Sequence, residues 1–207
     1  MNAHTQLLMI EGPAGQLELA LDEPVGTPQG VAVVAHPHPL FGGTLTNKVV
    51  QTLARACVQS GWRTVRFNFR GVGRSEGVHD NGLGELEDLL AVVQSQAPSG
   101  PLCLAGFSFG AFVTSHALAR LHPSREVRRV ALVGTAASRF SVAPVAPELH
   151  ERTLVVHGET DDTVPLAAVM DWARPQHLPV TVVPGVAHFF HGQLPLLKAL
   201  VLRHLKD

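Results

Sequence analysis

Short apolar segments rich in β-branched residues alternate along this chain with segments of helical periodicity, and this alternation limits the fold more than any other feature. Six apolar segments that read as buried strands follow residue 29: Gly30–Ala35, Arg63–Asn68, Leu102–Gly106, Val130–Val133, Leu154–Val156 and Val180–Val183. Strand–helix–strand units place their strands in parallel and their helices on the faces of the sheet. The pattern therefore predicts an α/β fold with a largely parallel sheet covered on both faces.

The segments between the predicted strands repeat their apolar residues every three or four positions, as amphipathic helices do. Five helices are predicted: Asn47–Gln59, Leu83–Val93, Ala111–Leu121, Leu166–Ala173 and Leu196–Leu205. One connection, residues 135–152, contains two prolines and shows no clear period. It is too short to form a separate cap domain, so we expect an open cleft.

The N-terminal part of the chain has a different pattern. Gln6–Ile10 and Gln16–Leu21 are separated by the sequence Gly12-Pro-Ala-Gly15, which favours a β-hairpin. We therefore expect eight strands, of which the first two are antiparallel. A chain of 207 residues fits one domain and is long enough to bury a core, so residues 1–207 are predicted to form a single domain.

Charge and composition exclude several classes of function. The chain has 16 Lys and Arg against 17 Asp and Glu, a net charge of −1, which argues against nucleic acid or an acidic membrane surface as partner. Cys57 and Cys103 are too few for a disulfide framework. No apolar run is long enough to span a bilayer, and residues 1–11 lack the pattern of a signal peptide. We expect a cytoplasmic protein with a small-molecule partner; the sequence leaves its oligomeric state open.

Two motifs that suggest a cofactor or a metal fail in detail. Gly71–Gly77 follows a predicted strand, but Glu76 stands where a dinucleotide-binding fingerprint requires glycine, and no P-loop occurs. His36 and His38 are two residues apart, yet their loop contains no cysteine or carboxylate, and two ligands do not hold zinc. We expect no cofactor and no metal, and we expect the His36 ring to bond nearby backbone.

The segment from Leu102 to Gly110 is the most informative in the chain. An apolar strand is followed by Gly106-Phe-Ser108-Phe-Gly110 and then by a helix. A strand that turns at once into a helix leaves its corner residue strained, and the residues two before and two after it must lack bulk. The corner side chain stands at a helix N-terminus, where developing negative charge is stabilised. This nucleophile-elbow pattern makes Ser108 the predicted nucleophile.

A serine nucleophile requires a base, and the base requires an acid that orients it. Glu159, Asp161 and Asp162 follow one predicted strand, and His188 follows the next. The carboxyl ends of parallel strands meet at one edge of the sheet, so the order Ser, acid, His fits this fold. Asp162 is the better candidate for capping the following helix, and we therefore choose Asp161 as the acid. We choose His188 as the base; His191, three residues later, is expected to cap the last helix or to line the pocket.

Acyl transfer through a serine nucleophile also needs hydrogen-bond donors that stabilise the oxyanion of the tetrahedral intermediate. One is expected from the backbone amide of Phe109, and the other from the loop His36-Pro-His-Pro-Leu-Phe-Gly-Gly43. Prolines in that loop have no N–H, so the amide of His38 is our choice and that of Leu40 the alternative. Six phenylalanines are candidates either for the wall of an apolar pocket or for core packing: Phe41, Phe107, Phe109, Phe140, Phe189 and Phe190.

Taken together, these motifs resemble the α/β-hydrolase superfamily. Gly106–Gly110 is similar to its nucleophile elbow, His157-Gly-Glu-Thr-Asp161 to its acid turn and Asn68–Ser75 to its R-G-x-G-x-S turn. The strings His36–Gly43 and His188-Phe-Phe-His-Gly192 resemble a small group of lidless, mostly bacterial serine hydrolases. The resemblance implies an eight-stranded sheet, a Ser-Asp-His triad and hydrolysis of an ester or thioester. The H-G loop common in the superfamily is His-Pro here, which leaves the second oxyanion donor open.

We therefore predict a serine hydrolase that cleaves a carboxylic ester or thioester of a small-molecule acyl substrate through an acyl-serine. The triad is Ser108, Asp161 and His188. An acyltransferase or perhydrolase would use the same acyl-enzyme, and the sequence does not separate it from a hydrolase. A non-catalytic binding module on this fold is a further alternative, which the three filled triad positions disfavour. Peptidase activity is less favoured, since no specificity pocket is visible.

Overall fold

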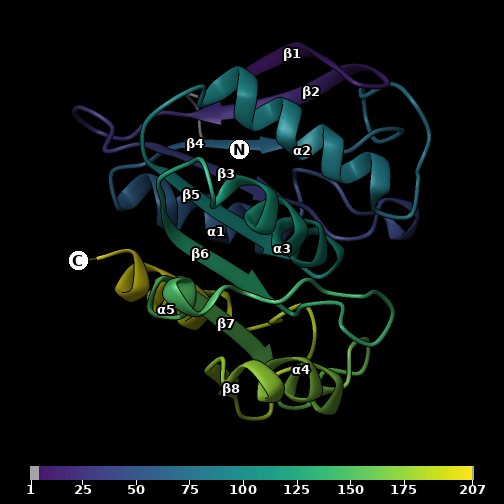
Figure 1. The fold of residues 1–207 in the computed structure, drawn as a ribbon, viewed down its shortest axis with the longest axis vertical. Helices are drawn as coiled ribbons and strands as arrows, with labels where there is room; N and C mark the ends of the chain where they lie inside the picture. Colours follow the sequence, from purple (N-terminus) through teal and green to yellow (C-terminus); the bar gives the residue numbers. More distant parts are fainter. Residues whose placement is uncertain (1–4, 207) are drawn as a thin grey trace.

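A computed structural model of the chain describes residues 5–206 and contains one eight-stranded sheet with the order β1-β2-β4-β3-β5-β6-β7-β8. Figure 1 shows the strands following one another from β1 at the top to β8 at the bottom. The strands are β1 (Gln6–Gly12), β2 (Gly15–Asp22), β3 (Val31–Ala35), β4 (Arg63–Phe67), β5 (Leu102–Phe107), β6 (Val127–Val133), β7 (Thr153–Gly158) and β8 (Val180–Val183). β2 pairs antiparallel with β1 and β4, and the remaining pairs are parallel. The predicted sheet with its N-terminal hairpin is confirmed.

Helices cover both faces of the sheet, as the alternation predicts. They are α1 (Lys48–Gln59), α2 (Leu83–Gln96), α3 (Phe109–Leu121), α4 (Leu166–Ala173) and α5 (Leu194–Leu205). α1 and α5 share one apolar cluster with the sheet, and α2, α3 and α4 share the other. The central strands β3, β5 and β6 are therefore buried on both faces, which explains why their sequences are continuous apolar runs.

The helix ends explain where our sequence boundaries differ from the structure. The Asn47 side chain accepts hydrogen bonds from the amides of Val49 and Val50, so α1 begins one residue after our predicted start. α5 begins two residues before our predicted start, because Pro195 fits the first helical turn, where a missing N–H costs nothing. No helix among residues 5–206 has the length and apolarity to cross a membrane.

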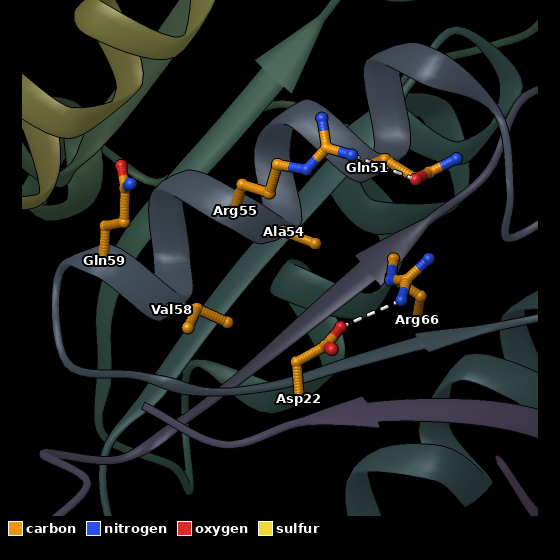
Figure 2. Close-up of a pocket in the computed structure, with 7 residues that line it drawn as sticks. All are labelled: Asp22, Gln51, Ala54, Arg55, Val58, Gln59 and Arg66. Atoms are coloured by element: carbon orange, nitrogen blue, oxygen red, sulfur yellow. Dashed lines mark hydrogen bonds and ion pairs between the residues drawn. The ribbon is translucent and has the colours of Figure 1, made fainter. Parts of the chain in front are cut away.

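A buried ion pair joins the antiparallel end of the sheet to its parallel part. The Arg66 guanidinium on β4 lies 2.8 Å from the Asp22 carboxylate at the end of β2, and it also donates to the Leu45 carbonyl oxygen. Arg66 is 2% exposed, so removal of Asp22 would leave a buried charge without a counter-charge. Figure 2 shows the pair at the floor of a pocket of about 300 Å³ beside α1. We assign this pair a structural role.

The strand order places the loops that carry the predicted catalytic residues at one edge of the sheet. β3, β5 and β6 are neighbours and run parallel, as do β6, β7 and β8. The loops that follow these strands therefore leave the sheet at the carboxyl edge, where open α/β sheets place their sites. The connection between β6 and β7 contains only the short 3₁₀ helix Pro147–Arg152 and forms no cap domain.

Candidate active site

Ser108 occupies the turn between β5 and α3 in a strained backbone conformation. Its φ of +58° and ψ of −116° lie in a region that residues other than glycine rarely adopt. A Cβ atom at Gly106 would lie 2.4 Å from the Gly110 carbonyl oxygen, and one at Gly110 would lie 2.4 Å from the Ala35 carbonyl oxygen. Both glycines are therefore required for β5, α3 and β3 to approach one another, and the turn projects the serine side chain from the edge of the sheet.

His188 connects Ser108 to Asp161. The loop after β8 places His188 Nε2 3.0 Å from Ser108 Oγ, and His188 Nδ1 2.6 Å from Asp161 Oδ2. A carboxylate can only accept, so Nδ1 carries the proton and Nε2 is free to accept from the serine hydroxyl. His188 is 2% exposed and packs against the Phe107 ring at a centroid distance of 4.9 Å. The structure thus brings the three predicted residues into one hydrogen-bonded chain.

Both oxygens of the Asp161 carboxylate are engaged. Oδ1 accepts from the amides of Thr163, at 3.0 Å, and Val164, at 2.7 Å, while Oδ2 accepts from His188. Burial alone would raise the pKa of Asp161, but the hydrogen bonds from His188 and Val164 outweigh it and hold the pKa below its ordinary value. Asp161 is therefore ionised at neutral pH and rigidly oriented.

The two other acids of this turn, Glu159 and Asp162, form no hydrogen bond with His188. Glu159 is exposed and accepts from the amide of Gly185. Asp162 is also exposed, and the prediction that it caps the following helix is wrong: α4 follows Pro165 and has no side-chain cap. The amides of Thr163 and Val164 donate to Asp161 Oδ1, so one carboxylate both orders the turn and orients His188.

His157 is a residue of the site to which we gave no role from the sequence. At the end of β7 it is fully buried, and its Nε2 lies 2.8 Å from the Val164 carbonyl oxygen and 3.4 Å from Asp161 Oδ2. Burial lowers the pKa of His157, so the ring is neutral and donates through Nε2. Both His157 and His188 thus lie close to Asp161 Oδ2. Its position at the start of the His157-Gly-Glu-Thr-Asp161 string is the sequence signal that could have identified it.

The loop after β3 lies beside the serine. The amide of Leu40 donates to His38 Nδ1 at 3.2 Å, so it is already occupied. The amides of His38 and Phe109 have no acceptor among residues 5–206. The His38 ring packs against the rings of Phe41 and Phe109, at centroid distances of 4.7 and 4.9 Å, and this packing fixes the loop next to the helix that follows Ser108.

His36 is structural, as predicted. It is fully buried, its Nδ1 donates to the Pro37 carbonyl oxygen at 2.6 Å, and its Nε2 accepts from the amide of Phe69 at 3.0 Å. Burial lowers the pKa of His36 to about 4, although the hydrogen bond to Pro37 partly opposes the change. Within residues 5–206, no group of three or more His, Cys, Asp or Glu side chains is arranged to hold a metal ion.

We expect His36 to make folding sensitive to acid. In the unfolded chain its ordinary pKa is 6.5, so below that pH the unfolded state binds a proton that the folded state accepts only near pH 4. The two pKa values correspond to about 3 kcal/mol of stability, lost as the pH falls from 6.5 to about 4. Urea unfolding of wild type and His36→Gln over this range measures the loss. The two free-energy curves should converge towards acid; parallel curves would contradict the prediction.

A pocket of about 420 Å³ opens beside Ser108. Its walls come from the loops after β3, β5, β6, β7 and β8, and its lining includes the rings of Phe41, Phe109, Phe140 and Phe189. Of the other two phenylalanines considered from the sequence, Phe107 and Phe190 are buried in the core and do not line the pocket. His191 lies outside it and lines a neighbouring hollow. The pocket can hold an apolar group next to the serine hydroxyl.

Known proteins resemble this chain over most of its length. A family model described as alpha/beta hydrolase fold matches residues 40–148. A serine hydrolase without a lid from Xanthomonas campestris is 38% identical, with a TM-score of 0.87, over 99% of this chain and 95% of that chain. An alpha-beta serine hydrolase homologue from Coxiella burnetii is 39% identical, with a TM-score of 0.83, over 97% of both chains. An uncharacterized protein of Rickettsia prowazekii is 28% identical over 194 residues, 88% of this chain and 81% of its own length.

Proposed function

Since this chain belongs to the alpha/beta hydrolase fold family and is a hydrolase, we propose that it cleaves a carboxylic ester or thioester through an acyl-serine intermediate. Ser108 is the nucleophile, His188 the general base and acid, and Asp161 the residue that orients His188. The observation that carries the proposal is the continuous chain of hydrogen bonds, 3.0 Å from Ser108 Oγ to His188 Nε2 and 2.6 Å from His188 Nδ1 to Asp161.

In the first half of the reaction, Ser108 Oγ attacks the substrate carbonyl carbon while His188 Nε2 takes its proton. Asp161 stays ionised and stabilises the imidazolium that forms, which its lowered pKa permits. His188 then gives the proton to the leaving alcohol or thiol. In the second half, His188 takes a proton from water, which attacks the acyl carbon. The bond from that carbon to Ser108 Oγ then breaks, His188 returns the proton to Oγ, and the carboxylic acid is released.

The tetrahedral intermediates place a negative charge on the former carbonyl oxygen. We assign its stabilisation to the amides of Phe109 and His38, which have no acceptor among residues 5–206. The amide of Leu40, our alternative, donates to the His38 ring, so we keep His38 as the second donor. Two preorganised donors of this kind commonly supply several kcal/mol of transition-state stabilisation.

The volume of the pocket and the single sheet support two further parts of the proposal, which are the small-molecule substrate and the single domain. A volume of about 420 Å³ is in the range of sites that bind small molecules. All eight strands of the described residues belong to one sheet, with an apolar cluster on each face. We therefore propose a single domain over residues 1–207 with a small-molecule acyl substrate.

A fluorophosphonate probe tests the nucleophile directly. Folded wild-type protein should be labelled at Ser108, as located by peptide mass spectrometry, and Ser108→Ala should not be labelled. Ser138→Ala, which removes an exposed hydroxyl near the same pocket, should be labelled like wild type. Absence of label on folded wild type would favour the non-catalytic binding module. A series of 4-nitrophenyl esters then defines the acyl length, and product analysis with an added alcohol separates hydrolysis from acyl transfer.

A further inference from the structure

The pocket beside Ser108 contains a permanently charged side chain that the proposed reaction does not use. Arg139 follows β6 and lines the pocket together with apolar, aromatic and uncharged polar residues and two histidines. No Asp or Glu is among the lining residues, and no carboxylate within residues 5–206 lies within 4 Å of the Arg139 guanidinium. The guanidinium is exposed and available to a ligand.

The backbone of Arg139 is held in place although its side chain is exposed. The amides of Arg139 and Phe140 both donate to the Ala136 carbonyl oxygen, at 3.2 and 3.1 Å. The Phe140 ring stacks on the Phe112 ring at a centroid distance of 4.7 Å and meets the edge of the Phe109 ring at 5.2 Å. This packing fixes Arg139 between the aromatic wall of the pocket and solvent.

The charge of Arg139 acts on the interior of the pocket. Burial is the main cause that lowers the pKa of His38, but the neighbouring charges of His79 and Arg139 contribute in the same direction, while buried Glu85 opposes them. His38 supplies one of the two oxyanion donors in our proposal. The charge of Arg139 is therefore close enough to His38 to act on it, with the smallest effect of the four causes.

The hollow next to the pocket contains a second cationic side chain, Lys48. It shares Asn47 and Phe189 with the pocket and is otherwise lined by Lys48, Val49 and His191, again without an acid. The serine pocket and this hollow thus hold one arginine and one lysine and no carboxylate among their lining residues. A cleft lined by one sign of charge attracts ligands of the opposite sign.

We infer that Arg139 binds a negatively charged group of the substrate, a carboxylate or a phosphate, while the apolar part of the substrate packs on the phenylalanine wall. The guanidinium can donate a pair of hydrogen bonds to two oxygens of either group. The preferred substrate is thus an anionic ester or thioester. The statement that the substrate is an ester or thioester rests on the proposed function. The statement that Arg139 binds an anionic group does not.

Binding of matched esters to Ser108→Ala tests the inference without turnover. Calorimetry compares monomethyl adipate with methyl hexanoate, which places the charge on the acyl half. It also compares 4-acetoxybenzoate and 4-acetoxyphenyl phosphate with 4-tolyl acetate, which places the charge on the alcohol half. We expect the anionic member of at least one set to bind about tenfold more tightly at low salt, and the preference to shrink as salt is added. The set that shows the preference identifies the charged half.

The second substitution decides whether Arg139 is responsible. In the Ser108→Ala background, Arg139→Gln should abolish the preference and Arg139→Lys should retain part of it. Arg203→Gln, which removes one exposed arginine from the end of α5 outside the pocket, should leave the preference unchanged. Equal binding of charged and neutral esters in both sets, or a preference that survives Arg139→Gln, would overturn the inference. An Arg139-dependent preference in a folded protein whose Ser108 is not labelled by a fluorophosphonate would sustain the inference on binding and refute the proposed function instead.

Discussion

Replacing Ser108 with alanine is expected to reduce kcat for ester hydrolysis by roughly 10⁵- to 10⁶-fold, because the triad residues act as a unit and no acyl-enzyme can form without the hydroxyl. The fold should remain, since alanine needs no more room than serine at the strained turn and the Ser108 amide still donates to the Val133 carbonyl oxygen. Initial rates with a short-chain 4-nitrophenyl ester measure the activity, and thermal unfolding followed by circular dichroism measures the fold.

The matched control for this prediction is Ser138→Ala, which should retain the wild-type rate within about twofold. Residual activity of Ser108→Ala above about 1% of wild type would mean that another group is the nucleophile. Cys103 is a poor substitute, because it is buried within β5, and its interaction with Cys57, together with burial, raises the pKa of its thiol. Its hydrogen bond with Cys57 is the largest cause of that change, so the thiol is protonated at neutral pH.

Much of the fold was predictable because each part of it leaves a local pattern in the sequence. The central strands must be apolar on both sides, the helices must present one apolar face, and the turn at Ser108 must have glycine two positions away on either side. The β-hairpin likewise follows from a four-residue turn sequence. These constraints act over fewer than about 15 residues, so they can be recognised in the sequence without knowledge of the tertiary contacts.

The parts that were not predictable depend on contacts between distant segments or on side-chain orientation. Whether Asp161 or Asp162 accepts from the backbone of the turn depends on which carboxylate turns inward, and Asp161 serves two partners at once because its oxygens face different elements. The amide of Leu40 is occupied only because the His38 ring turns back towards its own loop. The charge of Arg139 becomes significant only once the pocket around it is known to contain no acid.

Replacing Asp161 with asparagine is expected to reduce kcat by roughly 10⁴-fold with little change in the fold, and the geometry gives the reason. The amides of Thr163 and Val164 require an acceptor at the Oδ1 position, so the single carbonyl oxygen of asparagine will occupy it. Its NH₂ group then faces His188 Nδ1, which must become an acceptor. The proton moves to Nε2, and the imidazole can no longer take the proton of Ser108.

The tautomer of His188 provides a direct check of this explanation. Nitrogen NMR of His188 should show the Nδ1-protonated form in wild type and the Nε2-protonated form in Asp161→Asn, since the tautomer follows the group that faces Nδ1. Asp162→Asn removes the adjacent exposed carboxylate and should keep activity within about twofold of wild type. If Asp161→Asn stayed within tenfold of wild type, another acid would have to orient the base. Glu159 is not placed for that role, because it is exposed and its carboxylate accepts from the Gly185 amide.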